Sequence, residues 1–213
     1  LSGITRFHRV VPYGTPVPPD APSPTPVPLG PTPAELPDPM LATKPGVLVL
    51  QAPTRTVLGL QDAQPLRALY NRARSPVLLS RGSHPYRSIL VPVGGTATSW
   101  HGLDLAIDVA RMMGARITAL HVTQPQFIGG SLGAERASAV VEKVETVAAL
   151  YGLELDLKVV EGNPVRAVQR EAKDHQLVVV ARRRNQADTY FNPDVGLRIA
   201  LQVSCSSLLL SFD

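Results

Sequence analysis

The sequence predicts an α/β fold, a parallel sheet with helices on both faces. Two observations carry this prediction. From Tyr86 onward, short apolar runs alternate with amphipathic segments in the order β-α-β-α-β-α-β-α-β, which is typical of parallel sheets connected by helices. Several of the apolar runs, such as "QLVVVA" at 176–181, have no polar face, as expected of strands covered on both sides.

The strands of this region are expected at 86–93, 116–122, 153–162, 176–181 and 207–212. The helices are expected at 99–114, 134–152, 163–174 and near 194–203.

Local signals place the ends of these helices. Ser99 is the expected N-cap of the first, and Gly114 suits its end. Asn163 followed by Pro164 is a typical start for the third. The glycines ahead of the second helix predict a loop there, with Gly129, Gly130 and Gly133.

The first part of the chain has a different composition, because 13 of the 21 prolines lie between Pro12 and Pro45. Proline lacks an N–H group and fixes φ, so 12–45 is expected to be an extended linker or insertion with neither helix nor central strand. A proline-rich ligand for another domain is the alternative. After it, strands are expected at 46–53 and 75–80, with a helix at 63–73.

An internal repeat links the two parts. Residues 47–55 match 177–185 at an offset of 130, and at the same offset residues 75–80 align approximately with 205–211. Residues 8–16 resemble 157–164 at a larger offset, and the proline tract accounts for the difference. The sequence therefore predicts a complete unit at 86–213, preceded by the closing half of a first unit at 46–81, with 1–11 as a further strand of that partial copy.

Composition excludes several function classes. The net charge of +4 is too small to indicate nucleic acid binding without a basic patch. No apolar run is long enough to span a membrane, and no leader peptide is visible. The single cysteine, Cys205, allows no intrachain disulfide. The histidines show no metal-ligand spacing, so no metal is expected. His121 is expected to orient its loop, with a catalytic base as the alternative, so no catalytic residue is expected.

Several short motifs, taken in order, resemble a universal stress protein (UspA-like) domain. They are the strand "ILVPV" with the glycines after it, "ALHV", "VVEGNPVRAV" and the closing C-x-x-L-L-L. The match covers 86–213 completely and 46–81 as a partial copy. The resemblance implies a five-stranded parallel sheet of the adenine nucleotide α-hydrolase-like kind. It also implies a homodimer, or a pseudo-dimer of tandem copies, joined through the last strand.

The resemblance also locates a nucleotide site. ATP-binding members carry an acidic residue after the first strand and a glycine signature after the fourth. Here Gly94 takes the acidic position, Ala181 and Arg184 take the first two glycine positions, and the last pair falls within 193–195. Proline and aspartate in that last segment disfavour phosphate. The candidate cofactor-binding residues are Val93, Gly94, Gly95, Thr96, His121, Gly162, Ala181, Arg182, Arg183 and Arg184.

Three interpretations of the arginines stay open. They are solvated or salt-bridged in a degenerate, empty site; they form a remodelled anion or nucleotide site; or they belong to a surface for a protein or an anionic lipid.

The expected function is a non-enzymatic regulatory or sensory module with no cofactor and no metal. The alternative is a stress-response domain that binds ATP or another adenine nucleotide through the arginines. Because the chain begins without Met and inside a repeat, we expect a cytoplasmic domain, with a membrane transporter upstream as the wider context. A cation/proton antiporter or an amino-acid permease would fit, and the domain would then be tethered to the membrane.

Overall fold

The computed structural model describes residues 7–12, 27–29, 47–51, 64–81, 86–123, 126–184 and 194–212. Within them, the strands are β1 (Phe7–Pro12), β2 (Val27–Leu29), β3 (Val47–Gln51), β4 (Val77–Ser80), β5 (Ser88–Pro92), β6 (Arg116–Thr123), β7 (Leu155–Glu161), β8 (Leu177–Arg183) and β9 (Ser206–Phe212). The helices are α2 (Gln64–Arg72), α3 (Ala97–Met113), α4 (Gln126–Tyr151), α5 (Pro164–Glu171), the 3-10 turn η2 (Ala172–Asp174) and α6 (Val195–Gln202).

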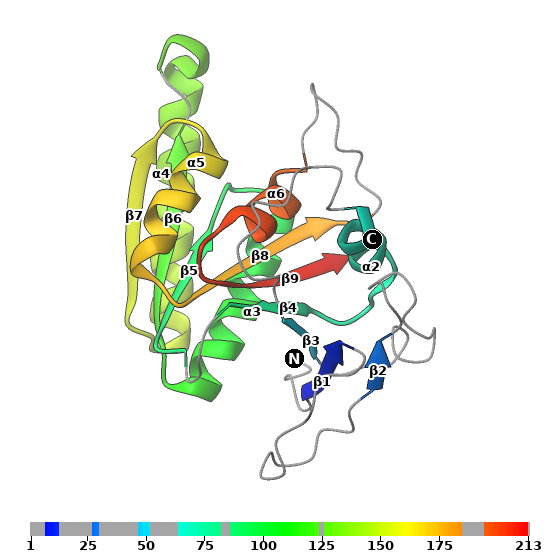
Figure 1. The fold of residues 1–213 in the computed structure, drawn as a ribbon. Coiled ribbons are helices and arrows are strands. Elements are labelled where there is room, and N and C mark those ends of the chain that lie inside the picture. Colours follow the sequence, from blue (N-terminus) through cyan, green and yellow to red (C-terminus); the bar gives the residue numbers. More distant parts are fainter. Residues whose placement is uncertain are drawn as a thin grey trace.

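The described strands form one continuous sheet in the order β2-β1-β3-β4-β9-β8-β5-β6-β7. Neighbouring strands are parallel, except that β4 and β9 are antiparallel. The strands β5 to β9 alone make a five-stranded parallel sheet, so the predicted fold class is confirmed. The antiparallel contact joins β4, from the first part of the chain, to the last strand (Figure 1).

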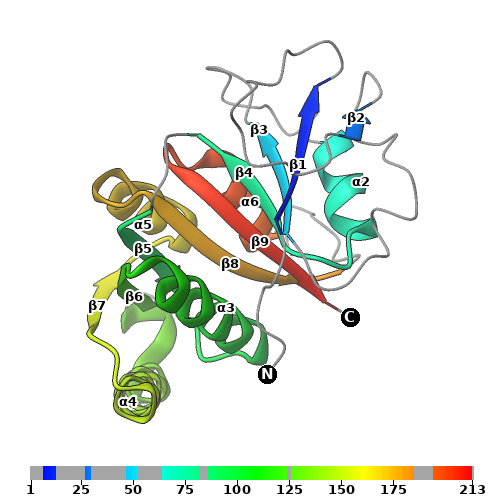
Figure 2. The same cartoon turned by 90° about the horizontal axis from the view of Figure 1, so that it is seen from below.

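Helices cover both faces of the sheet, and each face has its own apolar core (Figure 2). One core lies between the sheet and α3 and α4, with Ile107 and Val144 among its buried residues. The other lies under α2, α5 and α6 and includes Tyr70, Val168 and Ile199. Because α2 and α6 share this second core, the two parts of the chain are packed together on this face of the sheet.

Helix α3 begins earlier than expected. Its N-cap is Thr96, whose side chain accepts from the Ser99 N–H, while Ser99 lies within the first turn. The prediction of Ser99 as the cap is therefore wrong: both residues suit that position, and the chain uses the first of them. The predicted end is confirmed, because Gly114 adopts a left-handed φ of 63°.

The expected glycine loop before the second helix is also wrong. Helix α4 extends over Gln126–Tyr151, so Gly129, Gly130 and Gly133 are helical. Glycine costs roughly 1 kcal/mol in a helix interior. The later turns of α4 are anchored in the core by Val140 and Val144, and this burial outweighs local propensity at its start.

The first part of the chain places two strands at the sheet's far end. The three-residue β2 lies inside the proline-rich 12–45 and is an edge strand, a position that tolerates proline. Residues 8–16 resemble 157–164 in sequence, but the strands formed by these two segments take different places in the sheet. Strand β1 lies directly beside β3, whereas β7 is separated from β8 by β5 and β6. A short apolar run fits any parallel strand and does not fix its order.

Candidate functional site

The candidate site residues lie at the carboxyl ends of β5 to β8, which share one edge of the sheet. Val93 to Thr96 follow β5, His121 is near the end of β6, Gly162 follows β7, and Ala181 to Arg184 end β8. Ligands of open α/β sheets bind at this edge. The structure therefore brings the ten candidates to one side of the sheet, and their individual contacts decide what they can do there.

The turn after β5 is exposed and depends on one glycine. Gly95 has a φ of 74°, which other residues rarely adopt. A Cβ atom on Gly95 would come within 2.9 Å of the Val140 side chain. Thr96 is occupied as the cap of α3. The turn thus offers the exposed backbone of Gly94 and Gly95 to a ligand.

His121 fixes the ends of two strands. Its ring is buried, and Nδ1 lies 2.7 Å from the carbonyl oxygen of Val93. A carbonyl only accepts, so Nδ1 carries a proton and donates it. At the neighbouring strand end, Gly162 has a φ of 134° and its N–H donates to the Thr123 carbonyl. Both residues organise the backbone of this edge.

Arg182 is buried and paired inside the protein. Its side chain is 1% exposed, and Nη2 lies 2.6 Å from Oδ2 of Asp194, whose side chain is 0% exposed. Nη1 donates to Oδ1 of Asn71 on α2 at 2.9 Å. Burial lowers the pKa of Arg182, and the charge of Asp194 opposes that shift. A guanidinium held in this way faces the interior and does not reach a ligand.

The partner carboxylate of Arg182 lies at the start of a helix. Asp194 is the N-cap of α6, and its Oδ1 accepts from the Leu197 N–H at 3.0 Å. Helix N-termini attract negative charge, which is why phosphates bind there. At this helix the negative charge comes from the chain's own aspartate. The rest of the expected signature, 185–193, lies outside the described residues.

The other two arginines behave differently from one another. Arg184 donates from Nη1 to the carbonyls of Ala73 at 2.5 Å and Asn71 at 3.3 Å, and from Nη2 to the Ser211 carbonyl at 2.9 Å. Arg183 is exposed. The three arginines therefore point to three different environments and do not converge on one anion.

Two helix glycines close the space around the end of β8. A Cβ atom on Gly102 of α3 would lie 3.3 Å from the Ala181 nitrogen, and one on Gly196 of α6 would lie 3.3 Å from the Ala181 oxygen. The two helices thus approach Ala181 closely from opposite faces of the sheet. These contacts were missed by the sequence analysis, although a glycine within a predicted helix is a signal of close packing.

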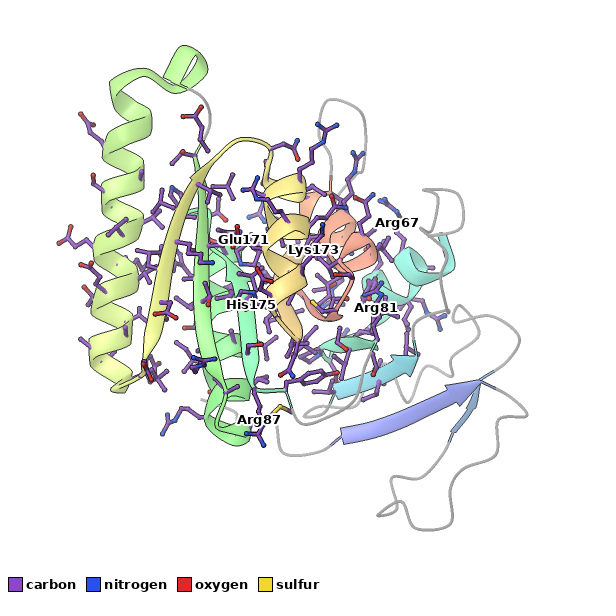
Figure 3. The ribbon with its side chains drawn as sticks, turned by 60° about the vertical axis from the view of Figure 1, so that its left-hand side comes forward. Arg67, Arg81, Arg87, Glu171, Lys173 and His175 are labelled. Carbon is purple, nitrogen blue, oxygen red and sulfur yellow. The ribbon has the colours of Figure 1, made fainter. Side chains whose placement is uncertain are left out.

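Arg81, whose contacts could not be predicted from the sequence, lies at the opposite edge of the sheet. Arg81 follows β4, near α6 (Figure 3), and donates from Nη1 to the carbonyls of Ala200 and Cys205 and from Nη2 to that of Leu201. Its Nη1 also lies 3.3 Å from Oγ of Ser207. Burial lowers the pKa of Arg81 and raises that of the Cys205 thiol to about 11, so the thiol is largely protonated at neutral pH.

The described part of the chain holds no group of three metal-ligating side chains. In the same residues, no helix is both long and apolar enough to cross a bilayer.

Residues 85–210 match the model of the universal stress protein family. Among solved structures, a candidate universal stress protein from Pseudomonas aeruginosa UCBPP-PA14 matches with a TM-score of 0.60 and 18% identity, over 82% of this chain and 66% of that one. A universal stress protein from Archaeoglobus fulgidus DSM 4304 matches with a TM-score of 0.56 and 14% identity, over 78% and 60%.

A universal stress protein solved in complex with cAMP matches with a TM-score of 0.49 and 19% identity, over 60% of this chain and 98% of that one. No curated protein matches significantly in sequence. The family match spans more than half of the residues, and the chain belongs to the universal stress protein family.

Proposed function

We propose that the chain is a non-enzymatic regulatory or sensory module whose strand-end site takes no adenine nucleotide. The observation that carries the proposal is the buried pair of Arg182 and Asp194. The carboxylate lies at the start of α6, where a phosphate would otherwise be held, and it neutralises the nearest guanidinium. A nucleotide phosphate that took the place of the carboxylate would leave the buried Asp194 without its partner and beside a second negative charge, at a cost of several kcal/mol.

The other side chains at this edge of the sheet support a non-enzymatic role. The His121 proton on Nδ1 is donated to a backbone carbonyl, and Thr96 is occupied as a helix cap. General acid–base catalysis needs a group whose proton faces the substrate. The described residues of this edge place no such group beside a nucleophile.

Titration of AMP and cyclic AMP, each of which carries a single phosphate group, at millimolar concentration is expected to leave the melting temperature unchanged. A ligand present at 100 times its dissociation constant adds about 2.7 kcal/mol to stability, which corresponds to a shift of roughly 5–10 °C for a chain of this size. Thermal unfolding followed by circular dichroism, with and without Mg²⁺, makes the measurement. A saturable shift with either nucleotide would contradict the proposal.

The second candidate is an adenine-nucleotide domain with a remodelled, arginine-containing phosphate site. The observation that favours it is the exposure of Arg183 at the same edge as the exposed backbone of Gly94 and Gly95. If a nucleotide does raise the melting temperature, Arg183→Gln should abolish the shift, and Arg111→Gln, an exposed arginine on α3, should preserve it.

We further propose that the chain is an internal pseudo-dimer of one partial and one complete unit. Strand registers support it. Leu48 of β3 is opposite Val77 of β4, and Val178 of β8 is opposite Ser207 of β9. Each residue of the second pair follows its counterpart by 130 positions, which is the offset of the sequence repeat. The antiparallel pairing of β4 with β9 then joins the last strands of the two units.

Reciprocal arginine contacts also support the pseudo-dimer. Arg81 of the first unit donates to the Leu201 carbonyl near the end of α6, and Arg184 of the second unit donates to the Asn71 carbonyl near the end of α2. Asn71 and Leu201 are again 130 positions apart. Each unit therefore supplies a cation to the carboxyl end of the other's helix, where the helix dipole is negative.

Light scattering at micromolar concentration is expected to give the mass of a single chain, because β9 already has β4 as its outer neighbour. A dimer mass would instead favour association of two chains through the sheet. Fusion to an upstream transporter, with a cytoplasmic location at the membrane, stays a prediction that the sequence preceding Leu1 tests: hydrophobic spans there would favour it.

A further inference from the structure

A hollow on the helical face of the sheet has features of an anion site. It lies between α5 and the end of α6, is open to solvent and has a volume of about 380 Å³. Its lining residues are Arg166, Gln169, Arg170, Lys173, Gln202 and Ser204. Lys173 of η2 is visible on this face, on the far side of the sheet from α3 (Figure 3). All six side chains carry hydrogen-bond donors, and none is acidic or apolar.

The positive charge of this hollow is largely uncompensated. Arg166, Arg170 and Lys173 recur at helical spacing along α5 and η2, and all three are exposed. Glu171 is held by Nζ of Lys158 at 3.0 Å, and its distance to Nε of Arg170 is 3.6 Å. Within the part of the chain that the structure describes, Arg166 and Lys173 make no ion pair.

The polar floor of the hollow is held in place by one contact between helices. Nε2 of Gln169 donates to Oε1 of Gln202 at 3.0 Å, so α5 and α6 are linked at this point. Gln202 keeps its own amide N–H groups as donors, and Ser204 adds a hydroxyl. An arrangement of three cations around neutral donors suits an oxyanion with several acceptor oxygens.

We propose that this hollow binds a phosphate-bearing small anion, freely diffusing in solution and carrying at least two phosphate groups. Three cations within one hollow exceed what a single carboxylate would neutralise, and the volume exceeds that of one phosphate. A membrane headgroup is the less suitable source. A lipid-binding face combines cations with exposed apolar residues, whereas Met112, Leu150 and Val159, the exposed large apolar residues described, lie on α3, α4 and β7.

This site is separate from the nucleotide edge. Lys173, Gln202 and Ser204 precede the starts of β8 and β9, whereas Ala181 to Arg184 end β8. The proposal therefore does not depend on whether the strand-end site is empty. A triphosphate could enter either site. If ATP binds, variants of each site are therefore needed to show which of the two it occupies.

The test is isothermal titration of inorganic pyrophosphate into the full chain at low salt, with variants that keep the fold. Saturable one-to-one binding is expected. Arg170→Gln combined with Lys173→Gln should weaken it at least tenfold, since each removes a charged hydrogen-bond donor. Arg111→Gln on α3, an exposed arginine of the opposite face, should leave the affinity unchanged.

Three results would overturn the proposal. The first is no saturable heat with pyrophosphate at millimolar concentration. The second is equal weakening by Arg111→Gln, which would indicate attraction by net charge alone. The third is sedimentation with vesicles of phosphatidylcholine and phosphatidylglycerol in the absence of pyrophosphate binding, which would assign the face to a membrane.

Discussion

Replacing Asp194 with alanine is expected to lower the free energy of unfolding by about 3–5 kcal/mol, because it leaves a buried guanidinium without its partner. Arg182 and Asp194 are 1% and 0% exposed and 2.6 Å apart, so water cannot replace the lost carboxylate. The same substitution removes the cap that accepts from the Leu197 N–H, which contributes about 1 kcal/mol of that loss. Urea unfolding followed by circular dichroism measures the effect.

Two further variants test whether the loss of stability comes from breaking the buried ion pair. Asp104→Ala, an exposed aspartate on α3, should change stability by less than about 0.5 kcal/mol. Asp194→Leu combined with Arg182→Met should recover at least half of the loss, because removing both charges of a buried pair is far less costly than removing one. If Asp194→Ala is as stable as Asp104→Ala, the buried pair does not hold this edge together.

Arg81→Met is expected to cost about 2–4 kcal/mol, through the loss of charge-assisted hydrogen bonds to the end of α6. The side chain donates to the carbonyls of Ala200, Leu201 and Cys205 at 3.1–3.3 Å. Carbonyls at a helix end have no partner within the helix, so they would lose hydrogen bonds in a partly buried place. Methionine keeps most of the apolar volume and isolates the polar contribution.

The matched control for Arg81 is Arg87→Met. Arg87 is exposed, and its backbone N–H, which donates to the Gln176 side chain, is unaffected by the substitution. Urea unfolding compares the two, and hydrogen exchange at β4 and α6 locates any local opening. Equal stability of the two variants would show that Arg81 does not link the first part of the chain to α6.

Much of the fold could be predicted because its signals are local. The apolar runs at 176–181 and 207–212 became β8 and β9, and the Asn163–Pro164 start of α5 was confirmed. Where the prediction failed, tertiary packing decided the outcome. The glycines before α4 suggested a loop, but the helix continues through them, and one face of its later turns is anchored in the core by Val140 and Val144. The resemblance of 8–16 to 157–164 carried no information on strand order, since neighbours in a sheet are set by contacts distant in sequence.

For the candidate site, too, the contacts between distant parts of the chain could not be predicted from the sequence. The apolar run predicts a strand that ends at Ala181, whereas β8 continues to Arg183. The run alone does not indicate which arginine faces inward. Alternation along β8 helps: Arg182 is buried and Arg183 exposed, as expected of successive strand residues. The partners could not be predicted, because Asn71 and Ala73 come from the other half of the chain and are brought to Arg182 and Arg184 by the sheet. Arg182 forms an ion pair and Arg183 is exposed, as expected of arginines that are solvated or salt-bridged, whereas Arg184 donates to backbone carbonyls.

Isothermal titration of ATP into the Arg170→Gln/Lys173→Gln variant decides whether the strand-end site takes an adenine nucleotide. That variant weakens the basic hollow and leaves the strand-end site intact. No saturable heat is expected up to about 5 mM ATP, a range in which a dissociation constant near 1 mM would be visible. Saturable one-to-one binding in this variant, abolished by Arg183→Gln, would contradict this expectation.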